Sequence, residues 1–242
     1  MRLAMRHKRL VEFLMNRHAS RGGSTIEFAL SLMVLMPLVL GVGAIGINLI
    51  RTQETIQLAR DAGHMYARKL DFTDQANMNL LSRLGAGLGL TNSVSSSGDA
   101  LVILSSLTYV DDTTCIAAIA ANPSNGCSNR TKWVFTQRQT VGNTTMATSA
   151  YGTPRPWTGT GDLIGVQMDS HGNISLDQYT DRAGAVANFT SANNGINPYS
   201  NVNGVISGLP SGARLYAAEA FSTGFGMPPF VKGTPTYSYA FF

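Results

Sequence analysis

One long uncharged stretch dominates the pattern near the start of the chain. From Phe28 to Ile50, 23 consecutive residues carry no charge. A helix of that length rises about 34 Å, enough to cross the roughly 30 Å hydrocarbon core of a bilayer. Because lipid offers no hydrogen-bond partners, a lone spanning segment has to be helical. The pattern predicts a transmembrane helix over residues 23–50, kinked at Pro37 because proline lacks a backbone N–H.

Helical periodicity continues beyond the membrane run. Apolar or small residues recur at three- and four-residue spacing, at Ile56, Ala59, Ala62, Gly63, Tyr66 and Leu70. This pattern predicts an amphipathic stalk helix over residues 51–71, which packs on the following domain or on a neighbouring subunit. The small residues Ala59, Ala62 and Gly63 would permit a close approach.

The composition changes after residue 71. Residues 72–98 predict a helix and a linker, because glycines follow the helical stretch and 92–98 is rich in serine. Residues 99–242 predict a β-rich domain. Its expected strands are 101–110, 131–140, 162–168, a hairpin of 202–207 with 214–224, and 237–242. The fold class expected for the whole chain is α+β.

Charge separates the first 22 residues from the rest. They hold six basic residues against one acid, Glu12. The positive-inside rule predicts that this basic leader stays in the cytoplasm and that the chain after the helix is exported. Without the leader the chain has 12 basic and 13 acidic residues. The net charge of +4 of the whole chain therefore comes from the leader and implies no nucleic-acid partner.

The membrane run is unlike an ordinary secretory signal. Such a signal has an apolar core of 7–15 residues followed by a small-residue cleavage site. Here the run is 23 residues long, and no small-residue cleavage site follows it, because it ends in Asn48, Leu49 and Ile50 before Arg51. We therefore expect the segment to be retained as a single-pass anchor.

Glu27 stands at the cytoplasmic edge of the apolar run. One interpretation is an interfacial carboxylate, solvated by headgroup water and favourable at a helix N-terminus. Another interpretation is that Glu27 is a recognition and pairing residue. The order of segments here is a basic leader, a glycine, four further residues, the pair Glu-Phe and an apolar helix. This order resembles the class III signal sequences of type IV pilins. The pattern is more closely similar to the TadE/TadG-like minor pseudopilins of tight-adherence secretion systems.

A second stretch, Arg51 to Leu70, strengthens this resemblance. TadE-like proteins carry a segment of the form Gln-x-x-x-x-x-Ala-Arg-(acid)-Gly/Ala-Ala-Arg-x-Ala here. The chain offers Gln53, then Ala59-Arg60-Asp61-Ala62-Gly63, then Tyr66-Ala67-Arg68. One departure is that the family's proline usually lies nearer the Glu-Phe pair than Pro37 does.

The resemblance implies a structural or assembly protein of a pilus or secretion apparatus in the bacterial inner membrane. A prepilin peptidase would cut between Gly22 and Gly23, or at the alternative bond between Gly23 and Ser24. Glu27 and Phe28 would serve subunit pairing. The implied partners are that peptidase, other pilin-like subunits, pilus assembly proteins and membrane lipid. The alternative function is an unprocessed single-pass envelope protein whose exported domain binds a partner or a surface.

The two cysteines, Cys115 and Cys127, both follow the membrane run. On the exported side a disulfide can persist, and we expect one here. In the chain-entropy model a loop of this size contributes about 3 kcal/mol. A metal site would need four ligands, and no paired cysteine or histidine lies near, so neither a metal nor a cofactor is expected.

No constellation of residues points to catalysis. His171 follows Asp169 and Ser170, but a triad is defined by geometry and not by adjacency in sequence. The pair Asp111-Asp112 is more simply explained as a solvated loop after a strand. An anchored enzyme such as a hydrolase is therefore the least favoured class.

Overall fold

The structure is a computed structural model of the chain. It describes residues 2–124, 126–188, 201–202, 205–206, 212–226, 228 and 232–242. The chain forms two compact units. The first holds residues 1–49 and 225–233, and the second holds residues 50–224 and 234–242.

The helix α1 (Arg2–Ala67) runs from the first unit into the second. It contains the whole uncharged run and continues without a break through Pro37. The kink expected at Pro37 stays a prediction. Its end is a helix-stop motif in which the Leu70 amide donates to the Met65 carbonyl (3.1 Å). Lys69 supplies the left-handed residue of this stop, with φ of 66°.

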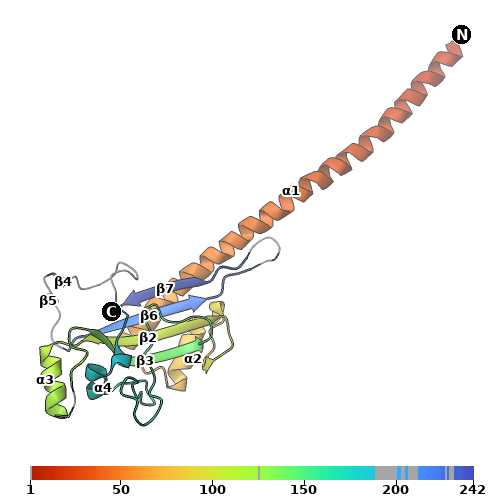
Figure 1. The fold of residues 1–242 in the computed structure, drawn as a ribbon. Helices are drawn as coiled ribbons and strands as arrows, with labels where there is room; N and C mark the ends of the chain where they lie inside the picture. The colour runs from red at the N-terminus through yellow and green to blue at the C-terminus, as the bar shows by residue number, and fades with distance from the viewer. Residues whose placement is uncertain are drawn as a thin grey trace. The chain divides into compact units, whose positions relative to one another are not determined.

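The second unit is built on one five-stranded sheet (Figure 1) with the order β1-β3-β2-β6-β7. The strands are β1 (Val94–Ser95), β2 (Ala100–Tyr109), β3 (Trp133–Asn143), β6 (Arg214–Ser222) and β7 (Thr236–Phe241). The central strand β2 is antiparallel to both neighbours, and nine of its ten residues are buried. A continuous run such as ALVILSSLTY, without proline, forms this kind of strand because both its faces are covered.

One face of the sheet is covered by the last turns of α1 together with α2 (Gln75–Leu84) and the short 3-10 helix η1 (Ala86–Leu88). Leu58, Ala59, Ala62 and Tyr66 of α1 are all buried in this core. A Cβ on Gly63 would lie 3.0 Å from the Ala218 Cβ and closer still to the Phe242 ring. Of the two packing alternatives for the stalk, the structure therefore has it packed on its own domain.

The other face is covered by the chain between β3 and β6. Its core contains Phe135, Tyr151, Val166, Ile174 and Ala185. The helix α4 (Leu176–Asp181) and the 3-10 helix η2 (Ala183–Ala185) belong to this layer. The sheet is thus sandwiched between helices on one side and mostly irregular chain on the other.

The disulfide expected between Cys115 and Cys127 is present. Cys115 lies on α3 (Asp112–Ala121), a helix that the sequence analysis missed. Asp111, expected in a solvated loop, accepts a hydrogen bond from the Thr114 amide (2.7 Å) and caps this helix. The alanine-rich run after it then supplies residues of high helix propensity.

Three further expectations need correction. Residues 162–168 form a loop and not a strand. The Asp162 side chain accepts hydrogen bonds from the Ile164 and Gly165 amides, which therefore do not pair with another strand. The expected linker 92–98 contains β1, which pairs in parallel with β3. In the predicted hairpin, β6 instead pairs with β2 and β7, while β4 (Asn201–Val202) and β5 (Val205–Ile206) pair with each other. Residues 203–204 and 207 of that hairpin lie outside the described residues.

Candidate functional site

The membrane run of α1 exposes its apolar side chains on nearly every side. Phe28 is 65% exposed, and large aliphatic side chains stay exposed as far as Ile50. The part of α1 from Gly23 to Ala67 is long and apolar enough to cross a membrane. So large a continuous apolar surface requires a cover, which lipid or other apolar helices would supply.

Gly22, Gly23, Glu27 and Phe28 all lie within α1. The Ser31 hydroxyl donates to the Glu27 main-chain carbonyl (2.8 Å). The Glu27 carboxylate itself is exposed and has no hydrogen-bond or ion-pair partner among the residues that the structure describes. Whatever this carboxylate binds therefore has to come from outside the described chain.

Four glycines of α1, one before the uncharged run and three within it, have no packing contact within the described chain. A Cβ built at Gly23, Gly41, Gly43 or Gly46 would meet no atom within 4 Å. Glycine lowers helix propensity, so its repeated use at open positions is not explained by packing within this subunit. Small residues are what membrane helices use where another helix approaches closely.

His171, which the sequence analysis weighed as a member of a triad, lies beside the end of the stalk. Its Nδ1 contacts the Asp71 carboxylate and also lies 3.2 Å from the Thr73 hydroxyl. In a catalytic triad the acid binds one nitrogen of the histidine ring and the nucleophile binds the other. Asp71 and Thr73 both contact Nδ1 of His171, so these three residues do not form a triad. Asp169 instead accepts from the His171 and Asn173 amides and shapes the local turn.

Asp71 joins three parts of the second unit. Its carboxylate accepts from the Thr73 amide (2.9 Å) and from the Gln139 side chain (2.7 Å) as well as contacting His171. Burial alone would raise the pKa of Asp71, but these hydrogen bonds outweigh it and lower the pKa below its ordinary value. The cluster borders a polar cavity of about 270 Å³ between the end of α1 and β3. Sequence reasoning missed Asp71, which stands 100 positions before His171.

Glu219 is a fully buried acid in the middle of β6. Its carboxylate accepts from the Ser149 hydroxyl, the Ala150 amide (2.8 Å) and the Tyr237 hydroxyl (3.0 Å). Burial, followed by the Glu219 charge, raises the pKa of Tyr237. An acid in a strand whose other charge is Arg214 at its first position was a visible signal of such a site, although its three donors are not readable from the sequence.

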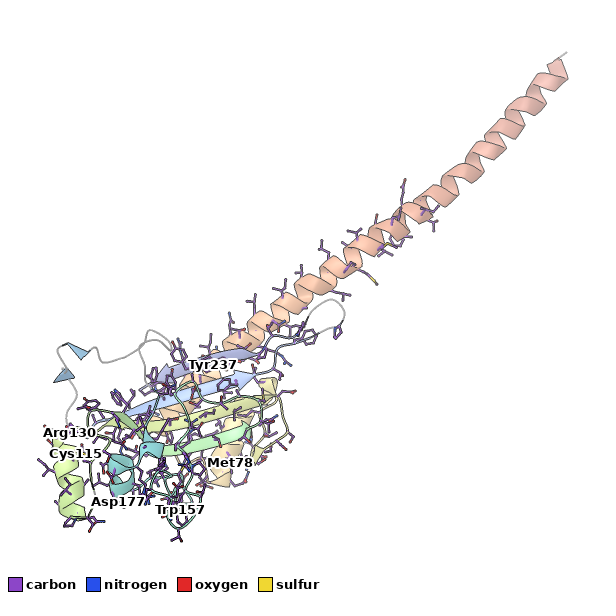
Figure 2. The ribbon with its side chains drawn as sticks, in the orientation of Figure 1. Met78, Cys115, Arg130, Trp157, Asp177 and Tyr237 are labelled. Atoms are coloured by element: carbon purple, nitrogen blue, oxygen red, sulfur yellow. A yellow bond between two sulfur atoms is a disulfide. The ribbon has the colours of Figure 1, made fainter. Side chains whose placement is uncertain are left out.

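An exposed apolar loop lies between residues 156 and 166. The Asp162 carboxylate accepts from the Ile164 and Gly165 amides and from Thr158, which fixes the backbone of the loop. Leu163 is nevertheless 82% exposed, and Ile164 and Trp157 are also exposed. Figure 2 shows the Trp157 side chain projecting away from the domain. The loop is thus an ordered surface that presents large apolar groups to solvent.

The residues that the structure describes contain no cluster of three or more acidic, histidine or cysteine side chains that could hold a metal ion. Neither His171 nor the Asp111-Asp112 pair forms part of a wider set of ligands.

Comparison with known proteins gives one family. Residues 22–64 match the family of TadE-like proteins. No curated protein and no solved structure matches the chain. The match covers the glycines, Glu27 and most of the stalk motif, so the resemblance drawn from these residues is confirmed for that segment. The TadE-like segment lies on a helix that is long and apolar enough to cross a membrane, which fits a single-pass anchor.

Proposed function

We propose that this chain is a pilin-like structural or assembly subunit that a prepilin peptidase processes between Gly22 and Gly23. The observation that carries the proposal is the match over residues 22–64 on a helix whose apolar surface and Glu27 carboxylate lack partners in the described chain. The leader would stay in the cytoplasm, and the second unit would lie outside the inner membrane. The TadE-like family is structural, which fits a role without catalysis.

Charge neutralisation gives Glu27 its role in this proposal. Cleavage would free an amine on Gly23, and the Glu27 carboxylate of one subunit would pair with the Gly23 amine of its neighbour. An unpaired carboxylate is costly in a helix bundle of low dielectric, whereas a paired one fixes the register between subunits. The open glycine positions of α1 would let neighbouring helices approach closely.

The mature N-terminus tests the proposal directly. Protein isolated from membranes should begin at Gly23, because the peptidase would remove the 22-residue leader. Gly22→Leu should block cleavage, since a bulky side chain replaces the glycine before the bond. Gly41→Leu is the matched control, because a Cβ there also meets open space but lies far from the bond. An intact N-terminus in the wild-type protein would refute processing.

The second candidate function is an unprocessed envelope protein whose exported domain binds a partner. The exposed loop with Trp157, Leu163 and Ile164 favours it, because exposed apolar groups on an ordered loop are typical of interaction sites. This function predicts an intact N-terminus and loss of envelope partners on Leu163→Asp. Thr160→Asp, on the same loop, should leave those partners bound.

A further inference from the structure

A cavity of about 370 Å³ lies against the face of the sheet that is turned away from α1. Val102 and Leu104 of β2 pack in the core beneath α1, so Leu101 and Ile103, which alternate with them, point to the opposite face and line the cavity. Leu101 and Ile103 are only 1% and 3% exposed. The floor of the cavity is therefore apolar and shielded from water.

Arg138 of β3 is the one charged residue among those that line this cavity. Its Nη1 donates to the Ser105 hydroxyl (2.6 Å), and its Nη2 donates to the Gly152 carbonyl (3.2 Å). A guanidinium has five N–H groups, so three of them have no hydrogen-bond partner among the described residues. No carboxylate in the described part of the chain forms an ion pair with Arg138.

The charge of Arg138 is only partly compensated. Burial lowers the pKa of Arg138 to about 10, while the charge of Glu219 acts in the opposite direction. The Glu219 carboxylate, however, accepts hydrogen bonds from three other donors and makes no direct contact with the guanidinium. The Phe135 ring lies 5.4 Å from the Arg138 Cζ, a cation–π contact that brings no negative charge. An anion with its own acceptor oxygens would stabilise this cation further.

The rim of the cavity is polar and open to solvent. Thr144, Thr148 and Thr153 line the cavity and are exposed, and Met168, which is 40% exposed, adds an apolar wall. A concave site of roughly 300–1,000 Å³ with apolar walls and a few placed polar groups is the usual form of a small-molecule site. The cavity combines this form with one cation.

We propose that this cavity binds a small monocarboxylate with an apolar body. The carboxylate accepts hydrogen bonds from the N–H groups of Arg138 that lack partners, and the apolar body lies on Leu101 and Ile103. A fully hydrated anion such as phosphate would match the cation but not the apolar floor, and an uncharged apolar molecule would match only the floor. The site belongs to the second unit alone, so it depends neither on leader cleavage nor on membrane anchoring.

Equilibrium dialysis of the full-length protein in detergent tests the site, with protein-free micelles as the baseline. The probe is 4-phenylbutyrate, and its uncharged counterpart is 4-phenylbutanamide, which has the same apolar body. The acid should bind saturably, with one equivalent per chain, and the amide at least tenfold more weakly. Equal affinities of the acid and the amide, or no saturable binding of the acid, would overturn the proposal.

Variants of Arg138 test the charge. Arg138→Gln should weaken binding of 4-phenylbutyrate at least tenfold, whereas Arg138→Lys should retain an intermediate affinity because it keeps the cation without the planar fork. Full affinity in Arg138→Gln would contradict the role of this residue. Arg138→Gln also removes the hydrogen bonds to Ser105 and Gly152, so a variant that leaves them intact is needed beside it.

Ala147→Trp supplies that variant. Ala147 lines the cavity and is partly exposed, so a tryptophan there should fill the space without removing a buried group. Binding should be lost while the thermal midpoint of the protein stays unchanged. Ala117→Trp, the same change at an exposed position of α3, should bind the probe as the wild type does. Undiminished binding by the Ala147→Trp variant would mean that the probe lies elsewhere and would refute the proposal.

Discussion

Glu219 and Glu27 are carboxylates of the same chemistry in opposite situations. Glu219 is fully buried and accepts from three donors of its own chain. Glu27 is exposed on an apolar helix, with no partner among the described residues. Because a carboxylate is stable in an apolar medium only with donors, the first serves the fold, whereas the second needs a donor from another molecule.

The proposed role of Glu27 predicts the effect of Glu27→Gln. If Glu27 pairs with the Gly23 amine of a neighbour, the substitution leaves that amine unpaired in a poorly solvated site, at a cost of roughly 3–5 kcal/mol. A subunit equilibrium would shift by roughly two to three and a half orders of magnitude. Membrane levels and leader cleavage should stay near normal, because the loss of a charge lowers the cost of insertion. Co-purification with other pilin-like subunits measures the loss.

Asp61→Asn is the matched control for this experiment. Asp61 is an exposed acid further along the same helix. Its neutralisation should leave co-purification unchanged. Were Glu27→Gln protein to retain its partners as well as the wild type does, Glu27 would be an interfacial carboxylate only.

Glu219 predicts an effect on stability instead. Glu219→Gln places an amide NH₂ among the Ser149 hydroxyl, the Ala150 amide and the Tyr237 hydroxyl, so a buried donor loses its acceptor. A buried polar group left unsatisfied costs about 1–3 kcal/mol. Urea unfolding of the full-length protein in detergent should show this loss, while Asp61→Asn shows little. An unchanged unfolding midpoint would mean that the site accommodates the amide by rearranging.

At the residue scale, the sequence could predict what residues near one another in the chain reveal, such as the motif around Glu27 and the disulfide that closes the short loop from Cys115 to Cys127. Glu27 was identifiable because its glycines, its phenylalanine and the apolar run all lie within a few positions. The contact between His171 and Asp71 was not, because the two residues are brought together by the end of α1 and a turn 100 positions later.

Among the elements, α1 shows how one helix can serve two environments. Before Ile50 its side chains are exposed on nearly every face, and after it one stripe is buried in the core of the second unit. The three- and four-residue spacing of that stripe is readable from sequence, which is why the stalk was predicted correctly as amphipathic. Its cover was not readable, because the sheet forms from residues far along the chain.

The packing of this stripe predicts the effect of Ala62→Leu. Ala62 is fully buried, and the neighbouring Gly63 lies close to Ala218 of β6. A larger side chain would push the helix off the sheet, and overpacking of this kind costs about 1–3 kcal/mol. Ala120→Leu makes the same change on an exposed face of α3 and should cost little. Equal thermal midpoints for the two variants would contradict close packing of the stalk.

The elements that sequence reasoning missed have physical causes. The helix α3 was hidden because its alanines and isoleucines lie between two cysteines and were interpreted only as a disulfide loop. Its Asp111 cap was the signal available. The strand β1 is two residues long and is held by pairing with β3, a tertiary contact that overrides its serine-rich sequence.

At the scale of the whole molecule, two of the predicted features bear on topology. The leader carries six basic residues, and the disulfide Cys115–Cys127 lies beyond the membrane run. Disulfides persist in oxidising compartments, whereas the positive-inside rule keeps basic flanks in the cytoplasm. Both features therefore favour a cytoplasmic N-terminus and an exported second unit.

Reporter fusions test this orientation. A phosphatase that is active only outside the cytoplasm should be active when fused after Leu70 or after Phe242, and a reporter active only in the cytoplasm should be silent at both sites. The reason is the asymmetry of charge, because the leader has a net charge of +5 and the chain behind it a net charge of −1. Replacing Arg2, Arg6, Arg9, Arg17 and Arg21 with glutamate should reduce the export of the phosphatase, whereas the same exchange at Arg51 and Arg60, beyond the span, should preserve it. Cytoplasmic activity of the wild-type fusions would overturn the orientation, and with it the proposed access of a peptidase to Gly22 from the cytoplasmic side.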